Sequence, residues 1–178
     1  LRKAVYIIAV TAASAASLGA QAADWYVRPN AATYGAGTGR SWTDAFSGFS
    51  AITWSSVVCG DTIWVAGGSY TSGIAVSKNC TAALPLNIKR VLSSDAQPAS
   101  ASGWSTSFDS LVVVSNSNPG ISIPSGSSIY VDGRVKYGIR IVTTAGGGDG
   151  AKAAMAGKPA KIALLGGAKA EINAGFVM

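Results

Sequence analysis

The middle of the chain, residues 60–143, consists of short apolar or β-branched runs that are separated by Gly, Ser and Asn. Short runs bounded by such turn formers are typical of β-strands. The predicted strands span residues 61–66, 73–77, 86–92, 111–115, 120–123, 128–131 and 138–143. Because no helical pattern separates these runs, layered α/β arrangements are excluded. The chain is therefore predicted to be mainly β, either a sandwich or a solenoid.

Two features of the runs favour a solenoid. The strands are short, and the turns between them lack the two-residue hairpin signals that are expected in a sandwich. The residues that mark these turns are Asn116, Asn118, Gly120, Gly126 and Gly133. A solenoid also needs a cap, because the open edge of its first coil would otherwise pair with other chains.

The segment before the coils predicts such a cap. Trp25-Tyr26-Val27 is a short aromatic and β-branched run that ends at Pro29, which indicates an opening strand. Ser41 and Asp44 have the spacing of a helix capping box. Apolar residues recur at helical intervals at Trp42, Ala45, Phe46, Phe49 and Ile52. We therefore expect a short helix over residues 41–52 that buries its aromatic side chains over the first coil.

The first 22 residues are typical of a secretory signal peptide. Arg2 and Lys3 precede an apolar run, and Ala20-Gln21-Ala22 fits a cleavage site between Ala22 and Ala23. The alternative, a membrane anchor, is disfavoured because Thr, Ser and Gly interrupt the run before it is long enough to span a bilayer. We expect a secreted bacterial protein, extracellular or periplasmic, with no membrane span after cleavage.

Two cysteines, Cys59 and Cys80, occur in this chain destined for an oxidising compartment. A disulfide between them is the natural interpretation. Closing a loop of this size stabilises a protein by about 3 kcal/mol in the chain-entropy model.

The charged and titratable residues exclude several functions. The chain has no His and a single glutamate, Glu171, so it offers no Ser–His–Asp or Cys–His catalysis, no His-ligated metal and no pair of glutamates. Its excess of basic residues is concentrated in residues 134–178, where few aromatic residues accompany it. Nucleic-acid binding is not expected from such a distribution.

Several motifs resemble those of a known superfamily. WYVRPN, GRSWTDAF and CGDTIWVAGGSYTSGIAV follow one another, and ISIPSGSSIYVDGRVKYGIRI comes later. Together, over residues 24–143, they resemble secreted proteins of the pectin-lyase-like superfamily. The resemblance implies a right-handed parallel β-helix with an N-terminal strand-plus-short-helix cap, and extracellular polysaccharide as a partner. It also implies Ca²⁺ as a cofactor; no cofactor is evident otherwise.

On this basis the chain divides into four parts. They are a signal peptide over residues 1–22, an N-terminal cap over 23–59, β-helix coils over 60–144 and a tail over 145–178. The coils are few compared with the superfamily. The tail is rich in Ala, Gly and Lys, and is either a degraded terminal coil or the sign of a truncated chain.

The candidate catalytic residues are Asp132, Arg134 and Lys136. Alternate residues of a strand share one face, so these three side chains are expected to point together. In the superfamily that the chain resembles, carboxylates on the outer face of one sheet hold Ca²⁺ against an acidic sugar, and an Arg or Lys removes a proton. The alternative is that Asp132-Gly133 forms a turn and the charges are solvated, since one Asp is a poor Ca²⁺ site.

Two other sets of residues have a structural and a functional interpretation. Asp61 follows Gly60 and either binds a ligand or caps a turn. A set of aromatic residues either stacks on sugars or belongs to the core and the cap. These residues are Trp42, Trp54, Trp64, Tyr70 and Trp104.

Two functional hypotheses follow. The first is a carbohydrate-active β-helix that recognises or acts on extracellular polysaccharide, a lyase or hydrolase in any full-length parent. The second is a non-catalytic adhesin or surface structural module. Resemblance to the superfamily favours the first, whereas the lack of His and the few acidic residues favour the second, because no complete catalytic site is visible.

Overall fold

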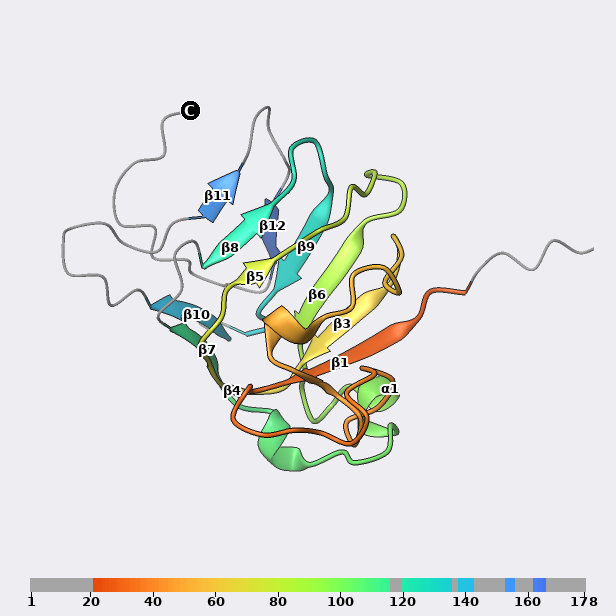
Figure 1. The fold of residues 1–178 in the computed structure, drawn as a ribbon, viewed down its shortest axis with the longest axis vertical. Helices are drawn as coiled ribbons and strands as arrows, with labels where there is room; N and C mark the ends of the chain where they lie inside the picture. Colours follow the sequence, from red (N-terminus) through yellow and green to blue (C-terminus); the bar gives the residue numbers. More distant parts are fainter. Residues whose placement is uncertain (1–20, 116–119, 136–137, 143–152, 156–161, 166–178) are drawn as a thin grey trace, which may run out of the picture.

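The computed structural model describes residues 21–115, 120–135, 138–142, 153–155 and 162–165, which form a mainly β protein with parallel sheets and little helix (Figure 1). The strands are β1 (Asp24–Arg28), β2 (Phe46–Ser47), β3 (Thr62–Val65), β4 (Gly68–Tyr70), β5 (Ile74–Ala75), β6 (Leu86–Arg90), β7 (Val112–Ser115), β8 (Ile121–Ile123), β9 (Ile129–Asp132), β10 (Ile139–Val142), β11 (Ala153–Met155) and β12 (Ile162–Leu165). The helical elements are the short helix α1 (Ala96–Ala99) and two 3-10 turns, η1 (Phe49–Ala51) and η2 (Thr106–Phe108).

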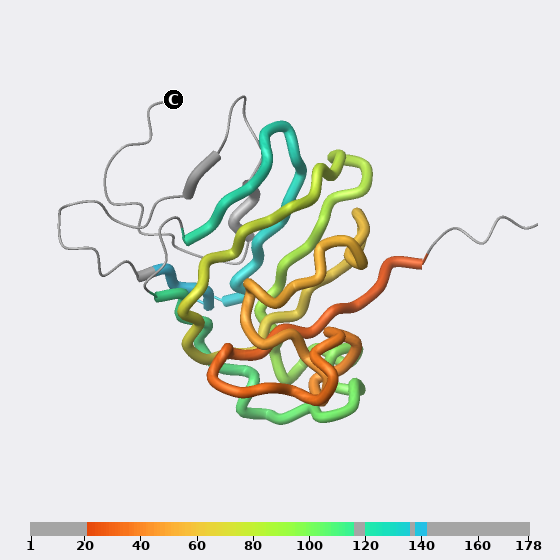
Figure 2. Tube along the Cα trace, in the orientation of Figure 1, coloured from red at the N-terminus to blue at the C-terminus, as the bar shows by residue number. Residues whose placement is uncertain are grey.

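The strands form three sheets. Sheet A has the order β12-β9-β6-β3-β1-β2, sheet B the order β10-β7-β4 and sheet C the order β11-β8-β5. All strand pairs in them are parallel, and each strand from β3 to β9 pairs with the strand three positions later in the chain. Successive passes of the chain therefore lie beside one another (Figure 2).

The main core lies between the three sheets. Strand residues alternate between two faces, and the inward-facing residues of all three sheets are apolar and buried. We call this the inner cluster; it comprises Trp25, Val27, Phe46, Phe49, Ile52, Val57, Ile63, Val65, Tyr70, Ile74, Val76, Cys80, Leu86, Ile88, Val112, Val114, Ile121, Ile123, Ile129, Val131 and Ile139.

A second core lies on the opposite face of sheet A. We call it the outer cluster; it comprises Tyr26, Trp42, Ala45, Trp64, Ala66, Val91 and Phe108, with Tyr34, Ala101 and Trp104 packed against it. Two segments, 29–45 and 91–111, supply the residues that cover β1 and β3 there. The aromatic rings are in contact, since the Trp42 ring centroid lies 4.7 Å from that of Tyr26 and 4.9 Å from that of Phe108.

The predicted helix over residues 41–52 is wrong. The Ser41 hydroxyl does accept a hydrogen bond from the Asp44 amide at 3.2 Å, as in a capping box, but no helix follows. Instead β2 pairs with β1, and Gly48 has a φ of 80°, which a right-handed helix does not allow. Only the three-residue turn η1 is helical. As a result the apolar residues of this segment divide between the outer cluster and the inner cluster.

The other predicted elements agree with the structure. The opening strand is β1, and the seven runs predicted between residues 61 and 143 match β3, β5, β6, β7, β8, β9 and β10, although β9 extends to Asp132, one residue beyond its predicted run. Sequence reasoning missed β2, which lies in the predicted helix, and β11, and it missed β4 because Gly67 and Gly68 indicate a turn. In the predicted tail, β11 pairs with β8 and β12 pairs with β9.

The predicted Cys59–Cys80 disulfide is confirmed. It joins the segment before β3 to the segment before β6, and such bonds are typical of proteins in oxidising compartments. Within the part of the chain that the structure describes, none of the helices has the length and apolarity needed to cross a bilayer.

Candidate functional site

The outer face of sheet A carries polar side chains on β6 and β9, next to the region that the outer cluster covers. Ile88 and Val131 point inward and are buried, so their neighbours along each strand point outward. Four of these outward residues are half-buried. We call them the polar strip; they are Asn87, Lys89, Tyr130 and Asp132.

The register of the two strands arranges the polar strip in two rows. Asn87 lies opposite Tyr130, and Lys89 lies opposite Asp132. Paired strands lie about 4.8 Å apart, so each row places two polar groups side by side on a pleated surface. The strip therefore presents an amide, a phenol, an ammonium and a carboxylate, which together can donate and accept several hydrogen bonds.

One side of the polar strip is bounded by Trp64 of the outer cluster. The Trp64 indole nitrogen donates a hydrogen bond to Asp24 Oδ1 at 2.7 Å, which fixes the ring. The Lys89 ammonium lies 5.8 Å from the centroid of that ring, within the range of a cation–π contact. Lys89 is thus held near the boundary while its side chain remains half-buried.

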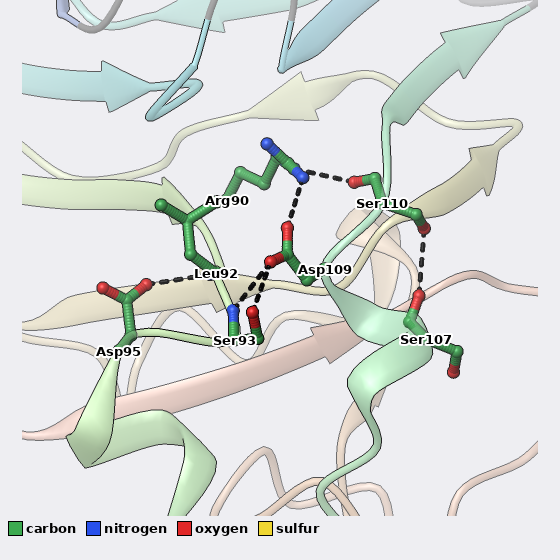
Figure 3. Close-up of polar contacts among 7 residues, drawn as sticks. All are labelled: Arg90, Leu92, Ser93, Asp95, Ser107, Asp109 and Ser110. Carbon is green, nitrogen blue, oxygen red and sulfur yellow. Dashed lines mark hydrogen bonds and ion pairs between the residues drawn. The ribbon is translucent and has the colours of Figure 1, made fainter.

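The segment between β6 and β7 is joined to the end of sheet A by a network of polar contacts around Arg90 (Figure 3). The Arg90 guanidinium forms an ion pair with Asp109 at 2.5 Å and donates from Nε to the Ser110 carbonyl at 2.7 Å. Asp109 Oδ2 also accepts hydrogen bonds from the Ser93 amide and hydroxyl. These contacts hold both ends of segment 91–111 close to the C-terminal end of β6.

The backbone hydrogen bond from Ser93, aided by the Ser93 hydroxyl and the Arg90 charge, lowers the pKa of Asp109 below its ordinary value. A lowered pKa means that ionised Asp109 stabilises the fold above the pKa of the unfolded chain, and that this stability is lost as the pH falls through the folded-state pKa. We expect Asp109→Asn to lower the unfolding free energy at pH 7 by about 1–3 kcal/mol, because buried Arg90 loses its partner. Thermal melts at pH 7 and pH 3 should differ less in the variant than in the unmodified protein.

Ser93→Ala is the matched control for this prediction. It removes the hydroxyl but keeps the backbone amide, which makes the largest contribution to the lowered pKa. The acid sensitivity of this variant should stay close to that of the unmodified protein. Equal acid sensitivity of Asp109→Asn and the unmodified protein would contradict the role assigned to Asp109.

Asp132 and Arg134, two of the candidate catalytic residues, do not share a strand face. β9 ends at Asp132, and Arg134 has a φ of 64° in the turn that follows, so the predicted continuous strand is wrong and the alternative of a turn at Asp132-Gly133 agrees with the structure. Asp132 Oδ1 accepts a hydrogen bond from the Arg134 amide at 2.7 Å, and the Arg134 guanidinium forms an ion pair with Asp95 at 2.5 Å. Lys136 lies outside the described residues. A catalytic role for the three stays a prediction.

The residues around Asp132 do not fit a Ca²⁺ site. Calcium takes six to eight oxygen ligands, whereas Asp132 is the one carboxylate of the polar strip and Asp95 is engaged by Arg134. Within the described ranges, no three Cys, Asp or Glu residues are grouped in a way that could hold a metal ion. We therefore derive no step through a metal.

The structural interpretation holds for several of the other residues considered from sequence. Trp42, Trp64 and Tyr70 are buried in the two clusters, whereas Trp54 and Trp104 are half-buried and pack against them. Burial raises the pKa of Tyr70 well above its ordinary value. Asp61 caps a turn through a hydrogen bond from the Val58 amide at 2.8 Å.

Sequence reasoning identified one of the four residues of the polar strip, Asp132. The alternation of polar and apolar residues in LNIKR and SIYV was the available signal for Asn87, Lys89 and Tyr130. Comparison with protein-family models, with curated proteins and with solved structures gave no match.

Proposed function

We propose that the protein is a secreted parallel β-helix protein, similar to the pectin-lyase-like superfamily, that recognises extracellular polysaccharide on the outer face of sheet A. The strand order supports a β-helix, since strands three positions apart pair in each of three sheets. The N-terminal motifs support the superfamily, and the disulfide between Cys59 and Cys80 supports export.

The observation that carries the proposal is the polar strip with its two matched rows. A polysaccharide presents many hydroxyl groups along an extended chain, so its recognition needs several donors and acceptors spread over a surface. Asn87 and Lys89 on β6 and Tyr130 and Asp132 on β9 supply them on a rigid sheet. Tyr130 adds an aromatic ring with a polar tip, a combination suited to a sugar that has both an apolar face and hydroxyl groups.

The charges of the strip favour recognition over turnover. Lys89 forms no ion pair with any residue that the structure describes, so its ammonium favours an acidic sugar. Asp132 and Arg134 are engaged with the turn and with Asp95, whereas a catalytic base must reach the proton that it removes. This observation favours a non-catalytic surface module that binds polysaccharide over a lyase or hydrolase that cleaves it.

Binding to immobilised polysaccharides tests the proposal. We expect the exported protein to bind an acidic chain such as polygalacturonate more tightly than a neutral chain such as xylan. Tyr130→Ala should weaken binding about tenfold or more, which corresponds to about 1.4 kcal/mol. Lys89→Ala should weaken binding to the acidic chain alone, and this effect should diminish at high salt.

Matched variants separate the strip from the rest of the surface. Tyr130→Phe retains the ring and should keep most of the affinity. Arg140→Ala removes an exposed cation from β10, in sheet B, and should leave binding unchanged. Binding that is insensitive to Tyr130→Ala and Lys89→Ala would refute the strip as the site. Release of unsaturated uronate from the acidic chain would refute recognition without turnover.

A further inference from the structure

The most buried charged residue of the described chain is Asp61, in the turn before β3. Its side chain is fully inaccessible to solvent, and it is held by three hydrogen bonds. Oδ1 accepts from the Ala23 amide at 2.8 Å. Oδ2 accepts from the Trp25 indole nitrogen at 2.7 Å and from the Val58 amide at 2.8 Å.

None of these three donors is a cation. The ion pairs among the described residues are Arg90–Asp109 and Arg134–Asp95, so no Lys or Arg there lies within ion-pair distance of Asp61. A buried carboxylate is costly unless its charge is paired, and neutral donors compensate it only in part. Asp61 therefore occupies a place where one more positive charge would stabilise the fold.

The Ala23 nitrogen belongs to the peptide bond at which the leader is predicted to be cleaved. Gln21 and Ala22 are exposed, whereas Ala23 is half-buried. Ala23 is also fixed from its other side, because its carbonyl accepts a hydrogen bond from the Thr62 amide at 3.0 Å. The fold thus holds the nitrogen against Asp61 and leaves Gln21 and Ala22 accessible.

We propose that Asp61 is the binding site for the N-terminal ammonium group that signal-peptide cleavage creates at Ala23. Hydrolysis breaks the bond between the Ala22 carbonyl carbon and the Ala23 nitrogen. Water supplies the hydroxyl for the new Ala22 carboxyl group and a proton for the amine, which takes a further proton from solvent at neutral pH. An α-amino group has an ordinary pKa near 8, so the product carries a positive charge there.

The processed chain would then be locked by an ion pair that the precursor lacks. The pair joins the start of β1 to the turn between Val58 and Asp61, next to the disulfide at Cys59. Maturation would in this way raise the stability of the protein only after export. The proposal does not depend on polysaccharide binding, because the polar strip is formed by other residues.

A double-mutant cycle on exported protein tests this coupling. The gene keeps its leader, and a serine is inserted between Ala22 and Ala23, so that the processed chain begins one residue earlier. Urea unfolding should show a folding equilibrium constant at least tenfold smaller for the insertion variant than for the unmodified protein. In an Asp61→Asn background, the same insertion should change this constant less than twofold.

Asp24→Asn is the matched control, because the Asp24 carboxylate also accepts an indole hydrogen bond near the N-terminus, whereas the Ala23 nitrogen donates to Asp61 and not to Asp24. The insertion should keep its full effect in that background. If Asp61→Asn does not fold, amine labelling of the native proteins decides. The Ala23 amine should react at least tenfold more slowly than the amine of the inserted serine. Three outcomes would overturn the proposal. The two amines could be labelled at equal rates, the insertion could have an equal effect with and without Asp61, or the exported unmodified chain could begin at a residue other than Ala23.

Discussion

Replacing Phe46 with alanine is expected to lower the free energy of unfolding by about 3–5 kcal/mol, the loss typical of a large aromatic side chain removed from a packed core. Phe46 is fully buried in the inner cluster, and its ring stacks on Trp25 with centroids 5.8 Å apart. Domains are stable by only about 5–15 kcal/mol, so the variant should melt at a much lower temperature and aggregate during expression. Urea unfolding measured by tryptophan fluorescence gives the difference.

Two further variants test whether packing is the cause. Phe46→Leu keeps most of the volume and should cost about 1.5 kcal/mol or less. Gly39→Ala leaves Phe46 in place but should also destabilise, because Gly39 has a φ of 75° and an added methyl group would overlap the Phe46 ring. A soluble Phe46→Ala protein with an unchanged melting temperature would show that the ring is no part of the core.

The sequence predicted the strands well because their signals are local. Runs such as LNIKR and SIYV alternate between apolar and polar residues, and turn formers bound them. The prediction failed where tertiary contacts override local pattern. Phe46 pairs with Val27 in a parallel ladder, and no helical spacing can reveal that pairing. β4 was missed because a Gly-rich segment becomes a strand only through its pairing with β7.

The candidate site was less predictable for the same reason. Asp132 was identified from its own neighbourhood, but the pairing of Lys89 with Asp132 depends on a strand register that joins residues more than 40 positions apart in the sequence. The ion pair between Arg134 and Asp95 is also remote in sequence, and Arg134 reaches it from the turn that follows β9. Which part of the outer face of sheet A stays open is decided by the outer cluster, whose members come from segments far apart in the sequence.

Replacing Trp42 with alanine is expected to lower the unfolding free energy by about 3–5 kcal/mol, through the outer cluster and not through the inner one. The Trp42 ring contacts those of Tyr26 and Phe108, and its indole nitrogen donates to the Pro98 carbonyl at 2.7 Å. Because Pro98 and Phe108 both belong to segment 91–111, loss of Trp42 should also free that segment from sheet A. Thermal melts give the first effect, and protease cleavage within residues 91–111 gives the second.

The comparison with two other variants locates the effect. Trp42→Phe retains an aromatic ring and loses the hydrogen bond to Pro98, so it should be less destabilising than Trp42→Ala. Trp104→Ala removes a ring that is half-buried at the rim of the same cluster and should also cost less. Phe46→Ala empties the inner cluster and should speed cleavage throughout the chain, because it promotes global and not local opening. If protease cleaved Trp42→Ala with the same pattern as Phe46→Ala, the two clusters would form one cooperative core. The outer cluster would then not be a separate cover that ends beside the polar strip.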